Sequence, residues 1–116
     1  PTQSTVTAQI IALHKEGEVV VQSVDGGENT VRINFTAKIG GTYQTWVSST
    51  VPINTWTHYA VTLDMNNRVC KTYVNGVYDR YSGVDTVQAG SLNTGTLNQR
   101  IGANIQGTPG NFYKGY

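Results

Sequence analysis

The stretch TVRINFTAKI, residues 30–39, constrains the fold more than any other part of this sequence. Its apolar residues occupy every second position, namely Val31, Ile33, Phe35, Ala37 and Ile39. The positions between them are polar or charged. Successive side chains of a β-strand point to opposite faces, so this pattern predicts a half-buried antiparallel strand. The fold must therefore cover one face of a sheet and leave the other to water.

Turn signals divide the rest of the chain into short runs of the same kind. Gly40-Gly41 predicts a hairpin between residues 30–39 and the run that follows, in which Tyr43 and Trp46 lie on opposite faces, so that only one of them is exposed. Asn75-Gly76 supplies the positive φ angles of a type I′ turn. Further strands are expected over residues 5–14, 19–24, 57–64, 68–74 and 96–105, with a turn at Asp25-Gly26-Gly27, a connection at Val51–Asn54 and loop from Gly83 to Gly95.

Composition agrees with a chain built of strands. Charged residues make up 13 % of the sequence and 13 glycines punctuate it, and no helical period of useful length occurs. About eight short strands at this spacing are typical of an antiparallel sandwich or barrel. We therefore expect one all-β domain over residues 1–116, an antiparallel two-sheet sandwich whose facing sheets bury the Val, Ile and Leu residues.

Charge and cysteine content exclude several classes of partner. The net charge of +1 comes from 8 Lys and Arg against 7 Asp and Glu without a basic run, so we expect no nucleic-acid partner. No apolar stretch is long enough to cross a membrane, which predicts no membrane insertion. Cys70 is the single cysteine, so no internal disulfide forms. Alternation in VCKTYV places it inside a sheet as an inert small side chain.

His58 is the residue that most invites a catalytic interpretation, because aromatic residues flank it. A general base needs an orienting carboxylate within hydrogen-bond reach. Asp64 shares its strand and face, but strand rise puts it about 20 Å away. We therefore expect a structural histidine whose ring nitrogen bonds the backbone or a neighbouring polar side chain.

The segments WTHYAVTLD, YVNGV, RIGA and FYKGY together resemble the laminin G-like branch of the concanavalin A-like lectin/glucanase superfamily. The resemblance covers residues 10–116 and implies a jelly-roll sandwich in which the tryptophan of the first segment serves packing. The residues that match this fold signature include Trp56, His58, Tyr73, Asn75, Gly76 and Gly102. The sequence lacks the opening strand usual in the family and ends at Tyr116, where a closing strand normally begins. The expectation is a shortened chain, further unresolved residues, or a partner chain that completes the sheet.

The resemblance also raises hydrolysis and calcium binding. Glucanases place acidic residues as E-x-D-x-x-E on one strand, whereas Glu16 and Glu18 merely flank a glycine in a predicted turn. The sequence therefore predicts no enzyme and disfavours a glycoside hydrolase. Related domains often hold Ca²⁺ at one rim, but the acidic residues here follow no ligand spacing. Calcium stays open as a cofactor, and no metal ligands are assigned.

The resemblance implies a non-catalytic module that binds carbohydrate or protein at an extracellular or cell surface, as in adhesion. Aromatic stacking and polar side chains would contact the ligand. The residues proposed for this contact are Tyr78, Tyr81, Asp85, Asn104 and Tyr113. The alternative is a structural component of an appendage, virion or surface that self-associates through open sheet edges, as a homo-oligomer or with a completing partner chain.

Overall fold

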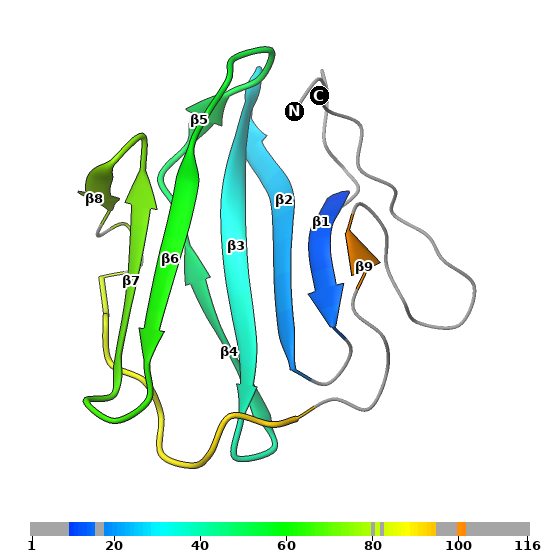
Figure 1. Cartoon of the computed structure of the whole chain (residues 1–116). Coiled ribbons are helices and arrows are strands. Elements are labelled where there is room, and N and C mark those ends of the chain that lie inside the picture. The colour runs from blue at the N-terminus through cyan, green and yellow to red at the C-terminus, as the bar shows by residue number, and fades with distance from the viewer. Residues whose placement is uncertain (1–9, 16–17, 80, 82, 95–99, 102–116) are drawn as a thin grey trace.

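The computed structural model describes residues 10–15, 18–79, 81, 83–94 and 100–101, and this part of the chain forms two antiparallel sheets (Figure 1). Sheet A has the strand order β4-β3-β2-β1-β9, with β5 also paired to β3, and sheet B has the order β6-β7-β8. The strands are β1 Ile10–Lys15, β2 Val19–Gly27, β3 Thr30–Ile39, β4 Thr42–Val47, β5 Val51–Pro52, β6 Tyr59–Asp64, β7 Val69–Val74, β8 Val77–Asp79 and β9 Arg100–Ile101. The predicted all-β two-sheet architecture is confirmed. No helix among these residues is long and apolar enough to span a membrane.

β3 pairs with β2, β4 and β5 in sheet A and is the half-buried antiparallel strand that its alternation predicts. Its inward positions are the buried ones, and Phe35 stacks on Trp46 of β4 with ring centroids 5.9 Å apart. The predicted hairpin pairs Ile39 with Thr42 across Gly40-Gly41. Trp46 is 1 % exposed and Tyr43 47 % exposed, so the two aromatic residues of β4 do lie on opposite faces.

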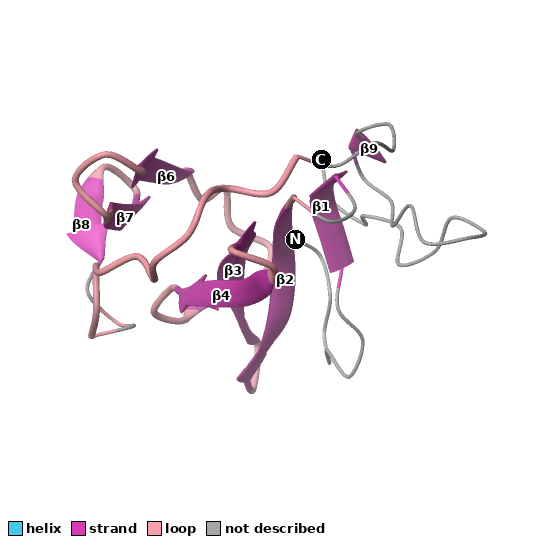
Figure 2. Cartoon of the chain, turned by 90° about the horizontal axis from the view of Figure 1, so that it is seen from below, coloured by secondary structure: helices cyan, strands magenta, loops and turns pink. Residues whose placement is uncertain are grey.

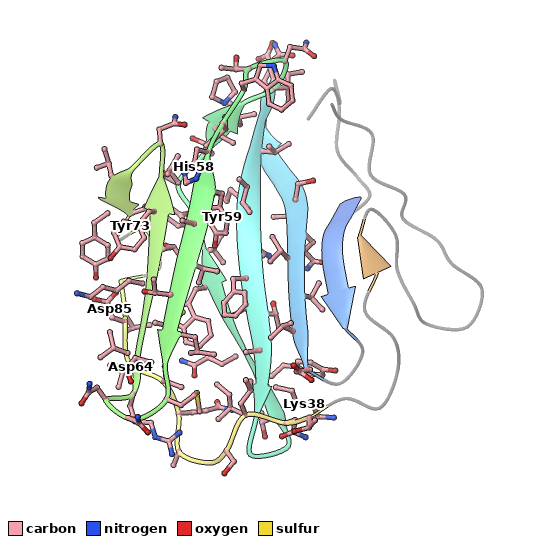
Figure 3. The ribbon with its side chains drawn as sticks, viewed as in Figure 1. Lys38, His58, Tyr59, Asp64, Tyr73 and Asp85 are labelled. Atoms are coloured by element: carbon pink, nitrogen blue, oxygen red, sulfur yellow. The ribbon has the colours of Figure 1, made fainter. Side chains whose placement is uncertain are left out.

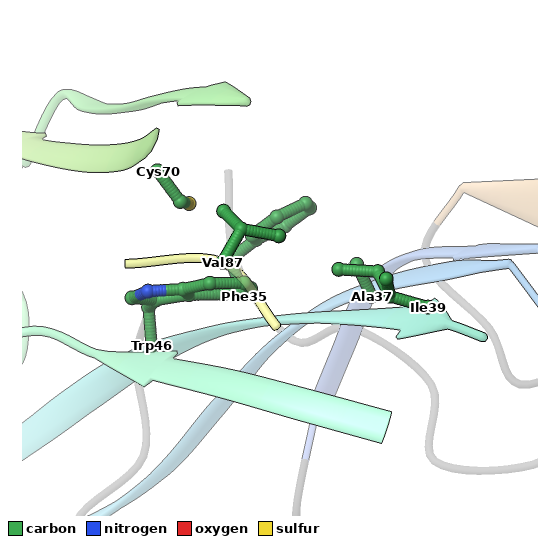
Figure 4. Packing of buried hydrophobic residues seen from close by; sticks show 6 residues of the cluster. All are labelled: Phe35, Ala37, Ile39, Trp46, Cys70 and Val87. Atoms are coloured by element: carbon green, nitrogen blue, oxygen red, sulfur yellow. The ribbon is translucent and has the colours of Figure 1, made fainter. Parts of the chain in front are cut away.

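The main core lies between the sheets (Figure 4). Sheet A contributes most of it, and Cys70 of β7 and Val87 of the segment after β8 cover it from the other side. Seen along the strands, sheet B lies over β3 and β4, while β1 and β9 extend to the side (Figure 2). The buried members are Phe35, Ala37, Ile39, Trp46, Cys70 and Val87. A second, smaller cluster surrounds Val31 and Val51.

Residues 83–94 connect the two sheets and are held at both ends. Isolated bridges join Thr86 to Val69 of sheet B and Leu92 to Ile39 of sheet A. The Arg68 guanidinium also donates to the carbonyls of Gln88 and Gly90. The segment is a loop, as expected, and these bridges and hydrogen bonds fix it to both sheets.

The largest differences from the predicted strand boundaries are in β2 and β5. β2 continues through the glycines to Gly27, with a bulge between Asp25 and Gly27, and the turn falls on residues 28–29. Bulges accommodate glycine within a strand, so the glycines did not end it. Val51 and Pro52 form a short strand against β3, because proline is tolerated at a sheet edge.

Other predicted strands are found with shifted or partly described ends. The run expected over 57–64 begins at Tyr59, and that expected over 68–74 begins at Val69. β1 and β9 fall inside the runs expected over 5–14 and 96–105, except that β1 continues to Lys15. Residues 5–9, 96–99 and 102–105 lie outside the described residues.

Candidate functional site

The outer face of sheet B carries a pair of tyrosines that the β7–β8 hairpin sets opposite each other. Asn75 and Gly76 have φ angles of 51° and 78°, which confirms the two-residue type I′ turn. A two-residue turn pairs Tyr73 directly with Tyr78. Their ring centroids lie 5.8 Å apart, with ring planes inclined by 44°. Their neighbour Thr72 is buried, so strand alternation turns both rings away from the core.

Two charged side chains complete the arrangement, which we call the tyrosine cluster: Lys71, Tyr73, Tyr78 and Asp85. The Lys71 ammonium lies 5.3 Å from the centre of the Tyr78 ring. The Tyr78 hydroxyl donates a hydrogen bond to the Asp85 carboxylate. All four residues are half-buried, so their side chains are supported and still reachable from solvent.

The neighbouring strand β6 carries small side chains beside the cluster. Ala60 pairs with Tyr73 and Thr62 pairs with Lys71, and both are small side chains. A flat ligand could therefore approach the rings from above β6 without displacing a bulky neighbour. Figure 3 shows Tyr73 and Asp85 on the β7 and β8 side of the molecule. Aromatic faces beside one donor and one acceptor group suit a ligand with apolar faces and hydroxyl edges.

Asp85 reaches the cluster because the chain leaves β7 after Asp79 and pairs with it again at Asp85. β8 pairs with β7 as far as Asp79, and pairing resumes where the Cys70 amide donates to the Asp85 carbonyl at 2.7 Å. The Val87 amide then donates to the Arg68 carbonyl. The Asp85 side chain is thereby placed within reach of Tyr78, seven residues earlier in the chain.

Tyr81 belongs to a different contact. Its ring lies 3.9 Å from the Arg32 guanidinium, and its amide donates to the Asp79 carboxylate. That carboxylate also accepts hydrogen bonds from the amide and hydroxyl of Ser49, at 2.8 and 2.9 Å. The structure therefore brings Tyr78 and Asp85 together and places Tyr81 elsewhere. Asn104 and Tyr113 lie outside the described residues.

The fold-signature residues take roles that differ from expectation. Trp56 was expected to pack as a core or sheet-edge anchor, but it is 79 % exposed, because it lies in the loop before β6 and not on the strand. His58 also precedes the strand and is exposed. Its main chain makes the contacts: its amide donates to the Asn75 side chain at 2.9 Å, and its carbonyl accepts from the Asn75 amide at 2.8 Å. In place of the expected ring hydrogen bond, the His58 backbone exchanges two hydrogen bonds with the side chain and the amide of Asn75. Gly102 lies outside the described residues.

Three of the described acidic side chains, Asp64, Asp79 and Asp85, are engaged in local structure. Asp64 accepts hydrogen bonds from the amides of Asn66 and Asn67, and Asp79 and Asp85 bond Ser49 and Tyr78. Across the described residues, no group of three or more His, Cys, Asp or Glu side chains gathers in a way that could hold a metal ion. These three carboxylates therefore serve hydrogen bonds within the fold. Glu16 lies outside the described part of the chain, so its pairing with Glu18 is untested.

Burial raises the pKa of two groups near the cluster, Cys70 and Tyr59. Burial, and after it the negative charge of Asp85, raises the pKa of the Cys70 thiol to about 12. Burial likewise raises the pKa of Tyr59, with smaller contributions from Cys70 and Asp79. Hydrogen bonds from Asn67 and Asn66 lower the pKa of the exposed Asp64. Cys70 is thus protonated at neutral pH and is not a nucleophile.

Sequence reasoning missed Lys71 as a site residue and assigned Tyr73 to the fold alone. The signal for both was available in the Asn75-Gly76 turn. A two-residue turn fixes hairpin register, which sets Tyr73 against Tyr78, and alternation then puts Lys71 on the same face. The contact with Asp85 had no such signal, because it depends on where the chain returns to β7.

Fold and site together define an antiparallel β-sandwich with an aromatic and polar contact surface on one sheet. A laminin G family model, described as concanavalin A-like lectin/glucanases superfamily, matches residues 1–116. The chain belongs to this family, as its fold signature indicated. Laminin G-like domains are generally non-catalytic, ligand-binding and extracellular. No curated protein and no solved structure matches the chain.

Proposed function

We propose that this chain is a non-catalytic module that binds carbohydrate at an extracellular surface, with the tyrosine cluster as its contact. The observation that carries the proposal is the pair of outward-facing tyrosines flanked by Lys71 and Asp85. Tyrosine rings stack on the apolar faces of sugars, while ammonium and carboxylate groups bond sugar hydroxyls.

The cluster is organised before a ligand arrives. The Tyr78 ring is held by its bond to Asp85, and both tyrosines stand on a hairpin of fixed register. Side chains that are already ordered lose little entropy on binding, so more of the contact energy contributes to affinity. This feature favours a binding role over an accidental surface grouping.

A glycan array followed by isothermal titration, with and without Ca²⁺, tests the proposal. Tyr78→Ala and Tyr73→Ala should each weaken binding roughly 3- to 10-fold, the effect of losing one aromatic contact. Tyr78→Phe keeps the ring and loses the bond to Asp85, so it should have the smaller effect. Tyr43→Ala is the control, because Tyr43 is an exposed tyrosine beside a lysine that lies on sheet A and outside the cluster. Equal losses in the Tyr43 and Tyr78 variants, or no glycan bound at all, would contradict the proposal.

A second candidate is assembly through a sheet edge. Within the described residues, β6 pairs with β7 alone and lies at one edge of sheet B. An unpaired edge presents backbone donors and acceptors to another strand. A second copy of the chain, or a partner chain, could add a strand there.

A hydrolase is the third and least supported candidate. Turnover of β-glucans that is lost on replacing Glu16 or Glu18 would establish it. No measurable turnover with either soluble or insoluble β-glucan would leave binding and assembly as the candidate functions.

A further inference from the structure

An exposed tryptophan stands on the loop of residues 53–58, which joins β5 to β6 at the upper end of the molecule in Figure 1. Trp56 is 79 % exposed, the largest exposure among the bulky apolar side chains of the described residues. Exposing a tryptophan forgoes the burial of a large apolar surface, which is the main contribution such a residue makes to stability. Its position therefore calls for a role outside the core.

Backbone contacts hold this loop at both ends. The Ile53 amide donates to the Asn29 carbonyl at 3.0 Å, and His58 exchanges two hydrogen bonds with Asn75. The hydroxyls of Thr55 and Thr57 each donate to the carbonyl two residues earlier. The tryptophan is thus presented from a loop of defined shape, which lowers the entropic cost of using it as a contact.

The residues on either side of Trp56, Thr55 and Thr57, are polar and carry no charge. Besides Trp56, the loop carries Ile53, Asn54, Thr55, Thr57 and His58, and the turn bonded to His58 is Asn75-Gly76. The Asn75 oxygen accepts from His58, so its amide nitrogen remains to donate to a ligand. No Asp, Glu, Lys or Arg occurs in residues 51–57 or 75–77. A tryptophan among hydroxyl and amide groups matches the apolar face and hydroxyl rim of a neutral sugar ring.

We propose that Trp56 is a stacking platform for a neutral sugar ring, a contact distinct from the tyrosine cluster. The inference rests on the proposed carbohydrate-binding function and names a class of sugar that this loop takes. The cluster offers Lys71 and Asp85, whereas the loop has no Asp, Glu, Lys or Arg. The two contacts therefore differ in the chemistry that they recognise.

The two tryptophans of the chain make a direct test available. Trp46 is 1 % exposed and Trp56 is 79 % exposed, so acrylamide should quench the fluorescence of Trp56 and spare that of Trp46. Cellohexaose, xylohexaose and chitohexaose serve as neutral probes. At least one of them should shield Trp56 from acrylamide. Trp56→Ala should weaken its binding roughly 3- to 10-fold, and Trp56→Tyr should retain most of the affinity.

Each outcome decides between the two proposals. Unchanged affinity in Trp56→Ala, with loss in Tyr78→Ala, would overturn the role of Trp56 and leave the proposed function standing. Binding of charged glycans alone would do the same. No glycan bound by the unaltered protein would overturn both. Shielding of Trp56 that appears without sugar and rises with protein concentration would assign the ring to contact between copies. Matched thermal unfolding midpoints confirm that the variants are folded.

Discussion

Asn75 shows how one residue joins two parts of this fold. Its φ angle of 51° is one that asparagine tolerates better than most side chains, and it opens the turn between β7 and β8. The same residue exchanges two hydrogen bonds with the backbone of His58. The fold signature formed by Trp56, His58 and the Asn75-Gly76 turn therefore contains a hydrogen-bonded cross-link between the loop before β6 and the β7–β8 turn. Its tryptophan takes no part in the cross-link and stays free for contact.

Cys70 gives a prediction at the same scale. Its side chain is 1 % exposed and its pKa is raised to about 12 by burial. The folded protein should leave DTNB unreacted at about pH 8, and unfolding in urea should release one reactive thiol per chain. Rapid reaction of the folded protein would show that β7 opens readily or that the thiol is exposed.

The same shift makes stability depend on alkaline pH. The folded state keeps the thiol proton, while the unfolded chain loses it near the ordinary thiol pKa of 9.0. The contribution is present below that value and is lost as pH rises toward about 12. Tyr59 acts in the same direction. Cys70→Ala should therefore flatten, though not abolish, the fall of unfolding free energy above pH 9, measured by urea titration.

At the scale of elements, residues 83–94 form a loop whose backbone is hydrogen-bonded to neighbouring strands, much as a strand would be. The Gly40 amide donates to the Ser91 carbonyl, and the Asn93 amide donates to the Lys38 carbonyl. The Gln88 side chain bonds the carbonyls of Ile39 and Thr42. The segment holds the β3–β4 turn close and closes one end of the core.

Gly90 is where this approach is tightest. A Cβ built there would lie 2.7 Å from the Gly40 Cα and 2.9 Å from the Gly40 nitrogen, and Gly90 has a φ of 119°. Gly90→Ala should lower the unfolding free energy by about 2–4 kcal/mol. Gly41→Ala is the control: its φ is 84° but nothing lies within 4 Å, so only backbone strain of about 1 kcal/mol applies. Equal effects in urea unfolding would show that the loop yields to the added methyl group.

At the scale of the whole molecule, the two sheets are unequal among the described residues. Sheet A has six strands and sheet B has three, and sheet B lies over β3 and β4 (Figure 2). The inward residues of β6, namely Tyr59, Val61 and Leu63, are only half-buried. An edge of this kind is where a further strand would add both hydrogen bonds and apolar cover.

The assembly hypothesis makes a prediction at this scale. If copies pair through β6, sedimentation velocity should show a dimer that grows with concentration. Thr62→Lys should abolish it, because Thr62 is exposed on that edge and a lysine on each copy would repel the other. Thr45→Lys is a control, because Thr45 is also exposed but lies on β4 of sheet A and not on the β6 edge. A monomer at every concentration would argue against assembly by the chain alone.

Local pattern was enough to predict much of the fold. The alternation in residues 30–39 gave the strand β3 and its buried face, because side-chain direction in a strand depends only on position. Gly40-Gly41 and Asn75-Gly76 gave two hairpins, because their φ angles are local properties. Burial of Cys70 followed from the same alternation. In contrast, Asp25-Gly26-Gly27 misled, since a bulge and a turn use the same residues.

The sequence by itself determined most of the strands, the register of the β7–β8 hairpin and the family. Tertiary structure alone decided that Asp85 meets Tyr78, that Tyr81 turns to Arg32 instead, and that Trp56 faces solvent. The reason is physical. Period-two patterning reports which side of a strand is apolar, but it carries no information about where a loop returns or how far a sheet extends over its partner. The candidate contacts of this protein depend on those two quantities.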